Sequence, residues 1–166
     1  MSPVAVIVGA PGAGKTTIGR ALATKLNVAF RDTDADVESQ TGKTVTDIFV
    51  EVGEPEFRRL EVNAVKAALA EHDGVLALGG GAVLAEETRA LLKSQPVVWL
   101  KVDLSSAADR VGLNTSRPLL LGNVRGTLKK LMDDREPLYR EVARLVIDTS
   151  EKSPTDVVTE IVEALA

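Results

Sequence analysis

Cysteine is absent from this chain, and aromatic residues make up only 3% of its 166 residues. Without cysteine the protein has no disulfide and no thiolate metal site, although this absence alone does not assign a cellular compartment. The single histidine, His72, has no second histidine to act with, and we assign it no chemistry.

Long hydrophobic runs and an excess of basic residues are missing too. The first apolar run, at 4–8, is too short for a signal sequence and has no basic flank, so we expect a cytoplasmic protein with no membrane partner. A net charge of −4 argues against a nucleic-acid carrier but is compatible with an anionic small-molecule ligand. No linker rich in proline, glycine or serine interrupts the chain, so we expect one domain over 1–166. We also expect a monomer.

The most specific motif is a phosphate-binding loop near the amino end. Residues 9–16 fill the pattern G-x-x-x-x-G-K-[ST], between an aliphatic run and a helical pattern at 18–26. The glycines let backbone N–H groups turn toward phosphate oxygens, Lys15 would reach the β- and γ-phosphates, and Thr16 would give its hydroxyl to Mg²⁺. The alternative is an ordinary glycine-rich turn between a strand and a helix. The residues expected to bind ATP in this loop are Gly12, Ala13, Gly14, Lys15, Thr16 and Thr17.

Short aliphatic runs alternate with helical patterns along the chain, which indicates βαβ units. Runs that are apolar on both faces favour a parallel sheet covered by helices on each side, with ligands at the carboxyl ends of the strands. The expected strands lie at 4–8, 28–30, 75–78, 97–102 and 145–147.

Two carboxylates, Asp32 and Asp34, follow the second expected strand. One could help to hold Mg²⁺ through water, and the other could accept a proton or a hydroxyl hydrogen bond. The third strand ends without the aspartate that many P-loop proteins place there for the metal, which favours Asp32 for that role. The alternative is that Asp34 is a helix cap and first-turn acid.

Glycine and arginine mark a second group of candidate binding residues. Gly79, Gly80 and Gly81 follow the third strand, where bare backbone allows the close approach of a ligand; a flexible turn is the alternative. Arg58 shares a helix face with acidic residues, so an exposed ladder of ion pairs is its alternative interpretation.

The helix that carries Arg58 is expected to run from Glu54 to about residue 70. A shorter helix at 46–52 precedes it, with Thr46 as its cap and Gly53 at its end. Phe49 and Phe57 are expected in the core.

Arginines and glycines alternate between residues 109 and 139, which favours a mobile lid, most of all at about 112–125. A closing lid that carries arginine can neutralise a moving phosphoryl group and exclude water, whereas the alternative is a solvated connection between helices. After the last strand, Ser153 is expected to cap a helix that begins at Pro154.

Taken together, these motifs resemble shikimate kinase, a P-loop family that phosphorylates the 3-hydroxyl of shikimate with MgATP in aromatic amino-acid biosynthesis. The resemblance implies a three-layer α/β P-loop kinase fold with a five-stranded parallel sheet of order 2-3-1-4-5. It implies ATP and shikimate as substrates and Mg²⁺ as the metal. The resemblance is carried by residues 9–16, Asp32-Thr33-Asp34, Phe57-Arg58, Gly79-Gly80-Gly81-Ala82, Arg117-Pro118-Leu119-Leu120 and Arg135-Glu136-Pro137-Leu138-Tyr139.

The same resemblance implies a role for each matching residue. Catalysis would fall to Lys15, Asp34 and Arg117, and the metal would lie at Thr16 and Asp32. Further ATP contacts would come from Arg110, Arg117, Lys152 and Pro154; some family members carry arginine instead of Lys152, and lysine stacks on adenine less well. Shikimate would be held by Asp34, Arg58, Gly79, Gly80, Gly81 and Arg135.

Two alternative functions stay open at the level of sequence. Another small-molecule P-loop kinase, of the gluconate or nucleoside monophosphate type, would share the phosphate loop but gives no reason for the three glycines beside Asp-x-Asp. A nucleotide-dependent switch or binding module is the other alternative, although the guanine-reading N-K-x-D tetrad is absent.

Overall fold

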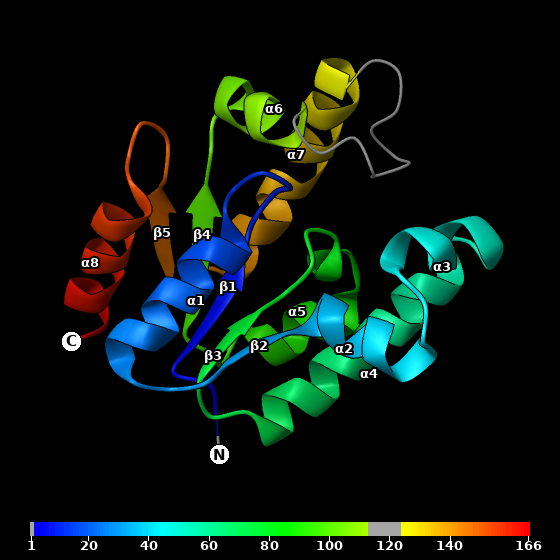
Figure 1. The fold of residues 1–166 in the computed structure, drawn as a ribbon, viewed down its shortest axis with the longest axis horizontal. Helices are drawn as coiled ribbons and strands as arrows, with labels where there is room; N and C mark the ends of the chain where they lie inside the picture. Colours follow the sequence, from blue (N-terminus) through cyan, green and yellow to red (C-terminus); the bar gives the residue numbers. More distant parts are fainter. Residues whose placement is uncertain (1, 113–123) are drawn as a thin grey trace.

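The computed structural model describes residues 2–112 and 124–166 (Figure 1). The described residues form one parallel sheet of five strands in the order β2-β3-β1-β4-β5, which confirms the predicted fold class and strand order. The strands are β1 (Ala5–Val8), β2 (Phe30–Asp32), β3 (Val75–Ala77), β4 (Val97–Lys101) and β5 (Leu145–Asp148).

The central strand β1 shows why these short aliphatic runs become buried strands. All four of its residues are at most 1% exposed, and alternate side chains enter two different cores. Ala5 and Ile7 pack on one face of the sheet, and Val6 and Val8 pack on the other. A strand that is buried on both faces needs apolar residues at every position, which is the pattern that the sequence has.

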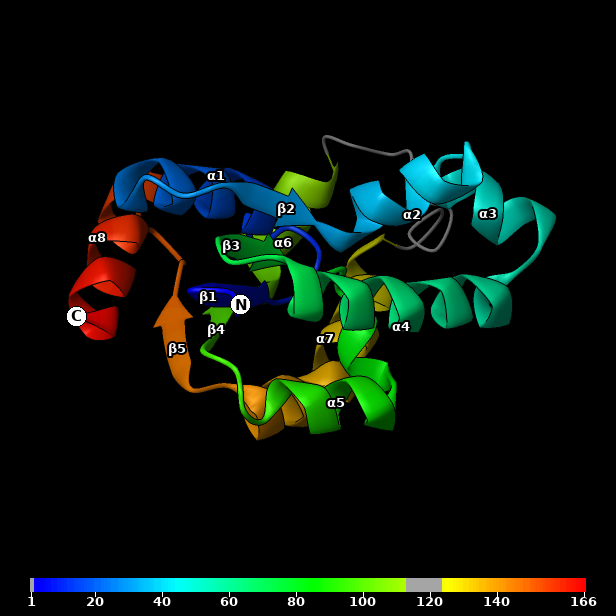
Figure 2. The same cartoon turned by 90° about the horizontal axis from the view of Figure 1, so that it is seen from below.

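Helices cover both faces of the sheet, so that the fold has three layers (Figure 2). One core contains residues of α1 (Lys15–Leu26), α6 (Leu104–Gly112) and α8 (Pro154–Leu165). The other contains residues of α4 (Glu54–Glu71), the 3-10 turn η1 (Ala82–Leu84) and α5 (Glu86–Leu92). Helix α7 (Val124–Val142) contributes to both, because Leu128 lies in the first core and Tyr139 in the second.

A third, smaller core lies beyond the sheet edge, where α2 (Thr33–Thr41) and α3 (Val45–Glu51) pack on the amino-terminal half of α4. In Figure 1 this extension projects from the β2 side of the sheet. It is built around Val37, Ile48 and Phe57, which are at most 2% exposed. The prediction that Phe57 is a core residue is therefore confirmed.

Two sequence-based boundaries were wrong for identifiable reasons. The second strand is Phe30–Asp32 rather than 28–30, because the Val28 N–H still bonds to the Ala23 carbonyl at the end of α1 (2.9 Å). The cap of α3 is Thr44 rather than Thr46: the Thr44 hydroxyl accepts a hydrogen bond from the Asp47 N–H at 3.1 Å. By contrast, Ser153 caps α8 as predicted.

The segment that alternates arginine and glycine is largely helical where it is described. Residues up to 112 belong to α6 and residues from 124 belong to α7, so both described ends of the 109–139 segment are helical. Burial of Leu128 and Tyr139 against the sheet explains why α7 is part of the body of the fold. Residues 113–123 lie outside the described residues, and a lid there stays a prediction. Within the described chain no helix is long and apolar enough to cross a membrane.

Candidate active site

A cavity of about 610 Å³ opens at the carboxyl ends of β1, β2 and β3. Its walls come from the phosphate loop, from α2, α3 and α4, from the glycines after β3 and from α7. It brings together most of the residues predicted for the phosphate, metal and acceptor sites. These are Gly12, Gly14, Lys15, Thr16, Thr17, Asp32, Asp34, Arg58, Gly79, Gly80, Gly81 and Arg135.

The phosphate loop is held in shape by its own backbone. Gly14 has a left-handed conformation (φ 85°) and starts α1, so that the first N–H groups of this helix face the cavity end of the fold. The ammonium of Lys15 donates to the carbonyl oxygens of Gly9 at 2.8 Å and Ala10 at 3.0 Å. Ala13 does not line the cavity: its side chain is fully buried, and its N–H bonds to the Ala10 carbonyl at 3.1 Å. The structure thus gives no direct support for Ala13 as an ATP contact.

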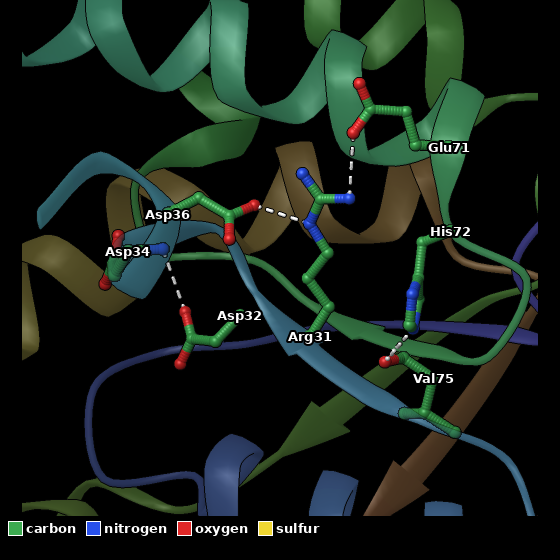
Figure 3. Close-up of polar contacts among 7 residues, drawn as sticks. All are labelled: Arg31, Asp32, Asp34, Asp36, Glu71, His72 and Val75. Atoms are coloured by element: carbon green, nitrogen blue, oxygen red, sulfur yellow. Dashed lines mark hydrogen bonds and ion pairs between the residues drawn. The ribbon is translucent and has the colours of Figure 1, made fainter. Parts of the chain in front are cut away.

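The junction of β2 and α2 carries the two predicted carboxylates into the cavity without an intervening loop. Asp32 is the cap of α2, and its Oδ1 accepts a hydrogen bond from the Asp34 N–H at 2.9 Å (Figure 3). The capping role that we considered for Asp34 therefore belongs to Asp32, and Asp34 lies in the first turn. In Figure 3 the guanidinium of Arg31 bridges Asp36 on α2 (2.7 Å) and Glu71 on α4 (3.0 Å), which ties the junction to the neighbouring helix.

Arg58 combines the two roles that the sequence left open. Its guanidinium pairs with Glu54 at 3.2 Å and with Glu61 at 2.9 Å, as in an ion-pair ladder, yet it also lines the cavity. Glu61 is only 3% exposed, and burial raises the pKa of this carboxyl, while the positive charge of Arg58 and their hydrogen bond oppose the rise. The pair is therefore an element of the cavity wall and not a solvated surface contact.

Glu61 and the two phenylalanines are cavity residues that sequence reasoning missed. Glu61 follows Phe57 by four residues, so both lie on the buried face of α4, and this spacing was a readable signal. Phe49 and Phe57 pack with ring centroids 4.8 Å apart and also line the cavity. They supply an apolar wall beside the charged one, so the expectation that they are only core residues was incomplete.

Two of the three glycines after β3, Gly79 and Gly81, lie where a side chain would collide with charged groups of the cavity. A Cβ on Gly79 would be 2.7 Å from an Asp34 carboxylate oxygen, and one on Gly81 would be 2.3 Å from a nitrogen of Arg58. A Cβ on Gly80 would lie 3.3 Å from Pro11 and 3.4 Å from the Gly9 carbonyl of the phosphate loop, and in ordinary contact with an Arg135 nitrogen at 3.5 Å. Each glycine therefore faces a different candidate acceptor-binding side chain, which argues against a merely flexible turn.

Arg135 on α7 places a buried guanidinium group at one end of the cavity. Its side chain is 6% exposed, and it forms no ion pair within the described residues. The neighbouring Tyr139 is 2% exposed and donates its hydroxyl to the Gly80 carbonyl at 2.6 Å. Glu61 is near enough for the charge of Arg135 to lower its pKa, but no carboxylate of the described chain pairs with Arg135 directly. Because a buried guanidinium without a directly paired anion is costly, this arrangement favours an anionic ligand at the Arg135 end of the cavity.

Of the residues expected at ATP beyond the phosphate loop, Lys152 and Pro154 do not line this cavity. Pro154 starts α8, and the ammonium of Lys152 pairs with Glu160 at 2.9 Å. The side chain of Arg110 and the whole of Arg117 lie outside what the structure describes. Their contacts with ATP stay predictions.

The protein side chains at this site could hold a divalent cation only if water molecules or substrate phosphates supplied the rest of its coordination shell. Thr16 and Asp32 both line the cavity, and both offer oxygen. In the described part of the chain no group of three or more His, Cys, Asp or Glu side chains could hold a metal by itself. Mg²⁺ suits such a site, because it keeps several waters and uses substrate phosphates with one or two protein ligands.

Comparison with known proteins agrees with this geometry. The sequence model of the shikimate kinase family matches residues 11–166. Shikimate kinases of Saccharopolyspora erythraea and Thermobifida fusca are 60% and 57% identical to this chain, over 98% and 93% of it and 94% and 90% of their own lengths. The structure of shikimate kinase from Acinetobacter baumannii in complex with shikimate superposes with a TM-score of 0.94 at 36% identity, covering 99% of this chain and 93% of that one. On these similarities in sequence and structure, the chain belongs to the shikimate kinase family.

Proposed function

We propose that this protein is a kinase that transfers the γ-phosphoryl group of ATP to the 3-hydroxyl of shikimate, giving shikimate 3-phosphate and ADP. The observation that carries the proposal is the composition of one cavity. A phosphate-binding loop forms one wall, and an aspartate with two arginines forms the opposite walls. A donor site and an anion-binding, hydroxyl-binding acceptor site thus share a single space.

Shikimate is a small anion with several hydroxyl groups, and the cavity matches each feature. Arg58 and Arg135 offer planar guanidinium groups that can form paired hydrogen bonds with a carboxylate. They lie beside neighbouring glycines, Gly81 and Gly80, so both reach the same stretch of backbone. Phe49 and Phe57 provide an apolar surface for the carbon ring. The glycines bind through close backbone approach.

The transfer itself needs a base, a neutralising cation and alignment. The 3-hydroxyl oxygen attacks the γ-phosphorus, the bond from that phosphorus to the bridging oxygen of ADP breaks, and Asp34 receives the hydroxyl proton. Lys15 leaves the carbonyl groups of its own loop and bridges the β- and γ-phosphates as charge moves onto ADP. Arg117, which lies outside the described residues, would supply positive charge to the phosphates, and this charge would be worth most in the transition state.

Magnesium would be held by Thr16 directly and by Asp32 through water. When bound it supplies positive charge to the β- and γ-phosphate oxygens. Asp32 uses Oδ1 to cap α2, and its second carboxylate oxygen would be the one to help hold the metal. A cytoplasmic location, a monomeric state and the absence of nucleic-acid and membrane partners complete the proposal and rest on composition and charge.

The test is an assay of ADP release with ATP, Mg²⁺ and one acceptor at a time. We expect turnover with shikimate and only background release with gluconate, a nucleoside monophosphate or no acceptor. Equal ADP release whichever acceptor is added would indicate the nucleotide-dependent module, and a preference for another acceptor would indicate a different small-molecule kinase.

A second measurement links the acceptor to the site. The amide analogue of shikimate, which lacks the negative charge, should bind the wild type less tightly but lose little further in Arg135→Ala, because both changes remove one interaction. Full additivity of the two losses would show that Arg135 does not meet the carboxylate.

A further inference from the structure

Tyr139 links two parts of the acceptor site that are far apart in the sequence. It lies on α7, is 2% exposed, and its hydroxyl donates to the carbonyl oxygen of Gly80 at 2.6 Å, across 59 residues. Gly80 is the middle residue of the glycine triplet, and Arg135 precedes Tyr139 by one helical turn. A single buried side chain therefore joins the helix that carries the arginine to the glycines that face it.

The ring of Tyr139 is itself held in place. Trp99 of β4 stacks against it, with ring centroids 5.8 Å apart and an interplanar angle of 28°, and Trp99 is 4% exposed. Burial raises the pKa of the Tyr139 hydroxyl to about 12, against the opposing effect of Arg135. The hydroxyl therefore keeps its proton and remains a donor throughout the pH range of an enzyme assay.

The helix alone does not secure this alignment. Pro137 lies inside α7, between Arg135 and Tyr139. Proline has no N–H to bond to the carbonyl one turn earlier, and its ring disturbs that turn, so the helix is locally weakened where the two residues must keep their spacing. A tertiary hydrogen bond to Gly80 fixes the carboxyl side of this weak point relative to the sheet.

We propose that Tyr139 is a positioning residue for acceptor binding: through its hydrogen bond to Gly80, it fixes Arg135 relative to the glycine triplet without touching either substrate. The inference deepens the proposed function, because it assumes that Arg135 meets the acceptor carboxylate. It assigns to the hydroxyl group a role separate from the packing role of the ring.

Tyr139→Phe separates the two roles, since phenylalanine keeps the ring and its stacking on Trp99 and removes only the hydroxyl. We expect the KM for shikimate to rise about tenfold, the scale of one hydrogen bond. The KM for ATP should stay within about twofold, because Tyr139 bonds to Gly80 of the proposed acceptor site and is not among the residues that line the cavity. Affinity for the neutral amide analogue should fall much less than affinity for shikimate, because the displaced Arg135 has no carboxylate to lose.

Val142→Ala is the matched control. Val142 lies on the same helix and in the same core as Tyr139, is 5% exposed, and forms no side-chain hydrogen bond. Its truncation should lower the melting temperature and leave both KM values unchanged. If Tyr139→Phe behaves in the same way, or weakens shikimate and the amide analogue equally, then Tyr139 is only a core residue and the inference is overturned. An inactive wild type would instead refute the proposed function, so the two failures are distinguishable.

Discussion

Alanine at Gly81 should damage acceptor binding while leaving the fold almost intact. Gly81 has φ −99°, a conformation that alanine adopts without strain, so the backbone does not require glycine. The obstacle is the guanidinium of Arg58: the new Cβ would lie 2.3 to 2.5 Å from three of its atoms, where ordinary contact begins at 3.4 Å. Arg58 must therefore retreat by about 1 Å, which its long side chain allows, although the displaced Nη1 also pairs with buried Glu61 at 2.9 Å, so a small loss of stability should accompany the change.

The magnitude follows from what that retreat breaks. A hydrogen bond to a charged group contributes about 1.5–3 kcal/mol, so loss of the Arg58 contact should raise the KM for shikimate about 10- to 150-fold. The KM for ATP and the melting temperature should change little, because Gly81 lies at the Arg58 side of the cavity and not at the phosphate loop. The measurement is the ADP-release assay with each substrate varied in turn, alongside thermal unfolding.

Two variants make the test specific. In an Arg58→Ala background, Gly81→Ala should add almost nothing, because the side chain that it displaces is already gone. Arg59→Ala is the matched control: Arg59 is the adjacent arginine, its side chain is 60% exposed, and it pairs with Glu56 away from the cavity, so kinetics should be unchanged. An unchanged KM for shikimate in Gly81→Ala, or equal effects with and without Arg58, would refute the placement of Arg58 at the acceptor.

Four further predictions follow from the same contacts. Lys15→Ala should cost about 3 kcal/mol or more of transition-state stabilisation, so near-normal kcat in single-turnover experiments would contradict its role at the phosphates. Asp34→Asn should lower kcat while calorimetry still detects shikimate binding, and loss of binding alone would make Asp34 a recognition residue only. Burial raises the pKa of Glu61, so the folded state holds this proton more tightly than the unfolded chain, and this group's contribution to stability falls as pH rises above 4.5. Glu61→Gln has no ionisable group at this position and so lacks this pH-dependent loss of stability. Between pH 4.5 and neutral pH, the melting temperature of the wild type should therefore fall relative to that of Glu61→Gln. Parallel plots of melting temperature against pH for the two proteins would count against a buried, ionising Glu61. Arg31→Ala should lower the free energy of unfolding by about 1 kcal/mol, and Asp36→Ala in that background should add less than it does alone; additive losses in chemical denaturation would show that the pair is not coupled.

The structure also explains which sequence boundaries were unreadable. Val28 is apolar and precedes a strand, so periodicity counted it as strand, but its N–H completes the end of α1. The cap of α3 was misplaced because Thr44 and Thr46 are equally good cap residues, and the choice depends on the carboxylate of Glu38, which accepts from the Val45 N–H at 2.8 Å. Such decisions depend on neighbours in space, which local propensity does not record.

The phosphate loop and the strands themselves could be predicted from the sequence because their causes are local or periodic, whereas the strand order was implied only by the family resemblance. A loop that must wrap phosphate needs its glycines and lysine at fixed spacing, and strands buried on both faces need uninterrupted aliphatic residues. Only tertiary structure decided that Gly81 faces Arg58, that Tyr139 donates to Gly80, and that Arg135 is buried within the described chain without an ion-pair partner. These facts arise where α4, α7 and the end of β3 meet, and side chains that meet across 20 to 60 residues leave no period or spacing in the sequence from which the contact could be read.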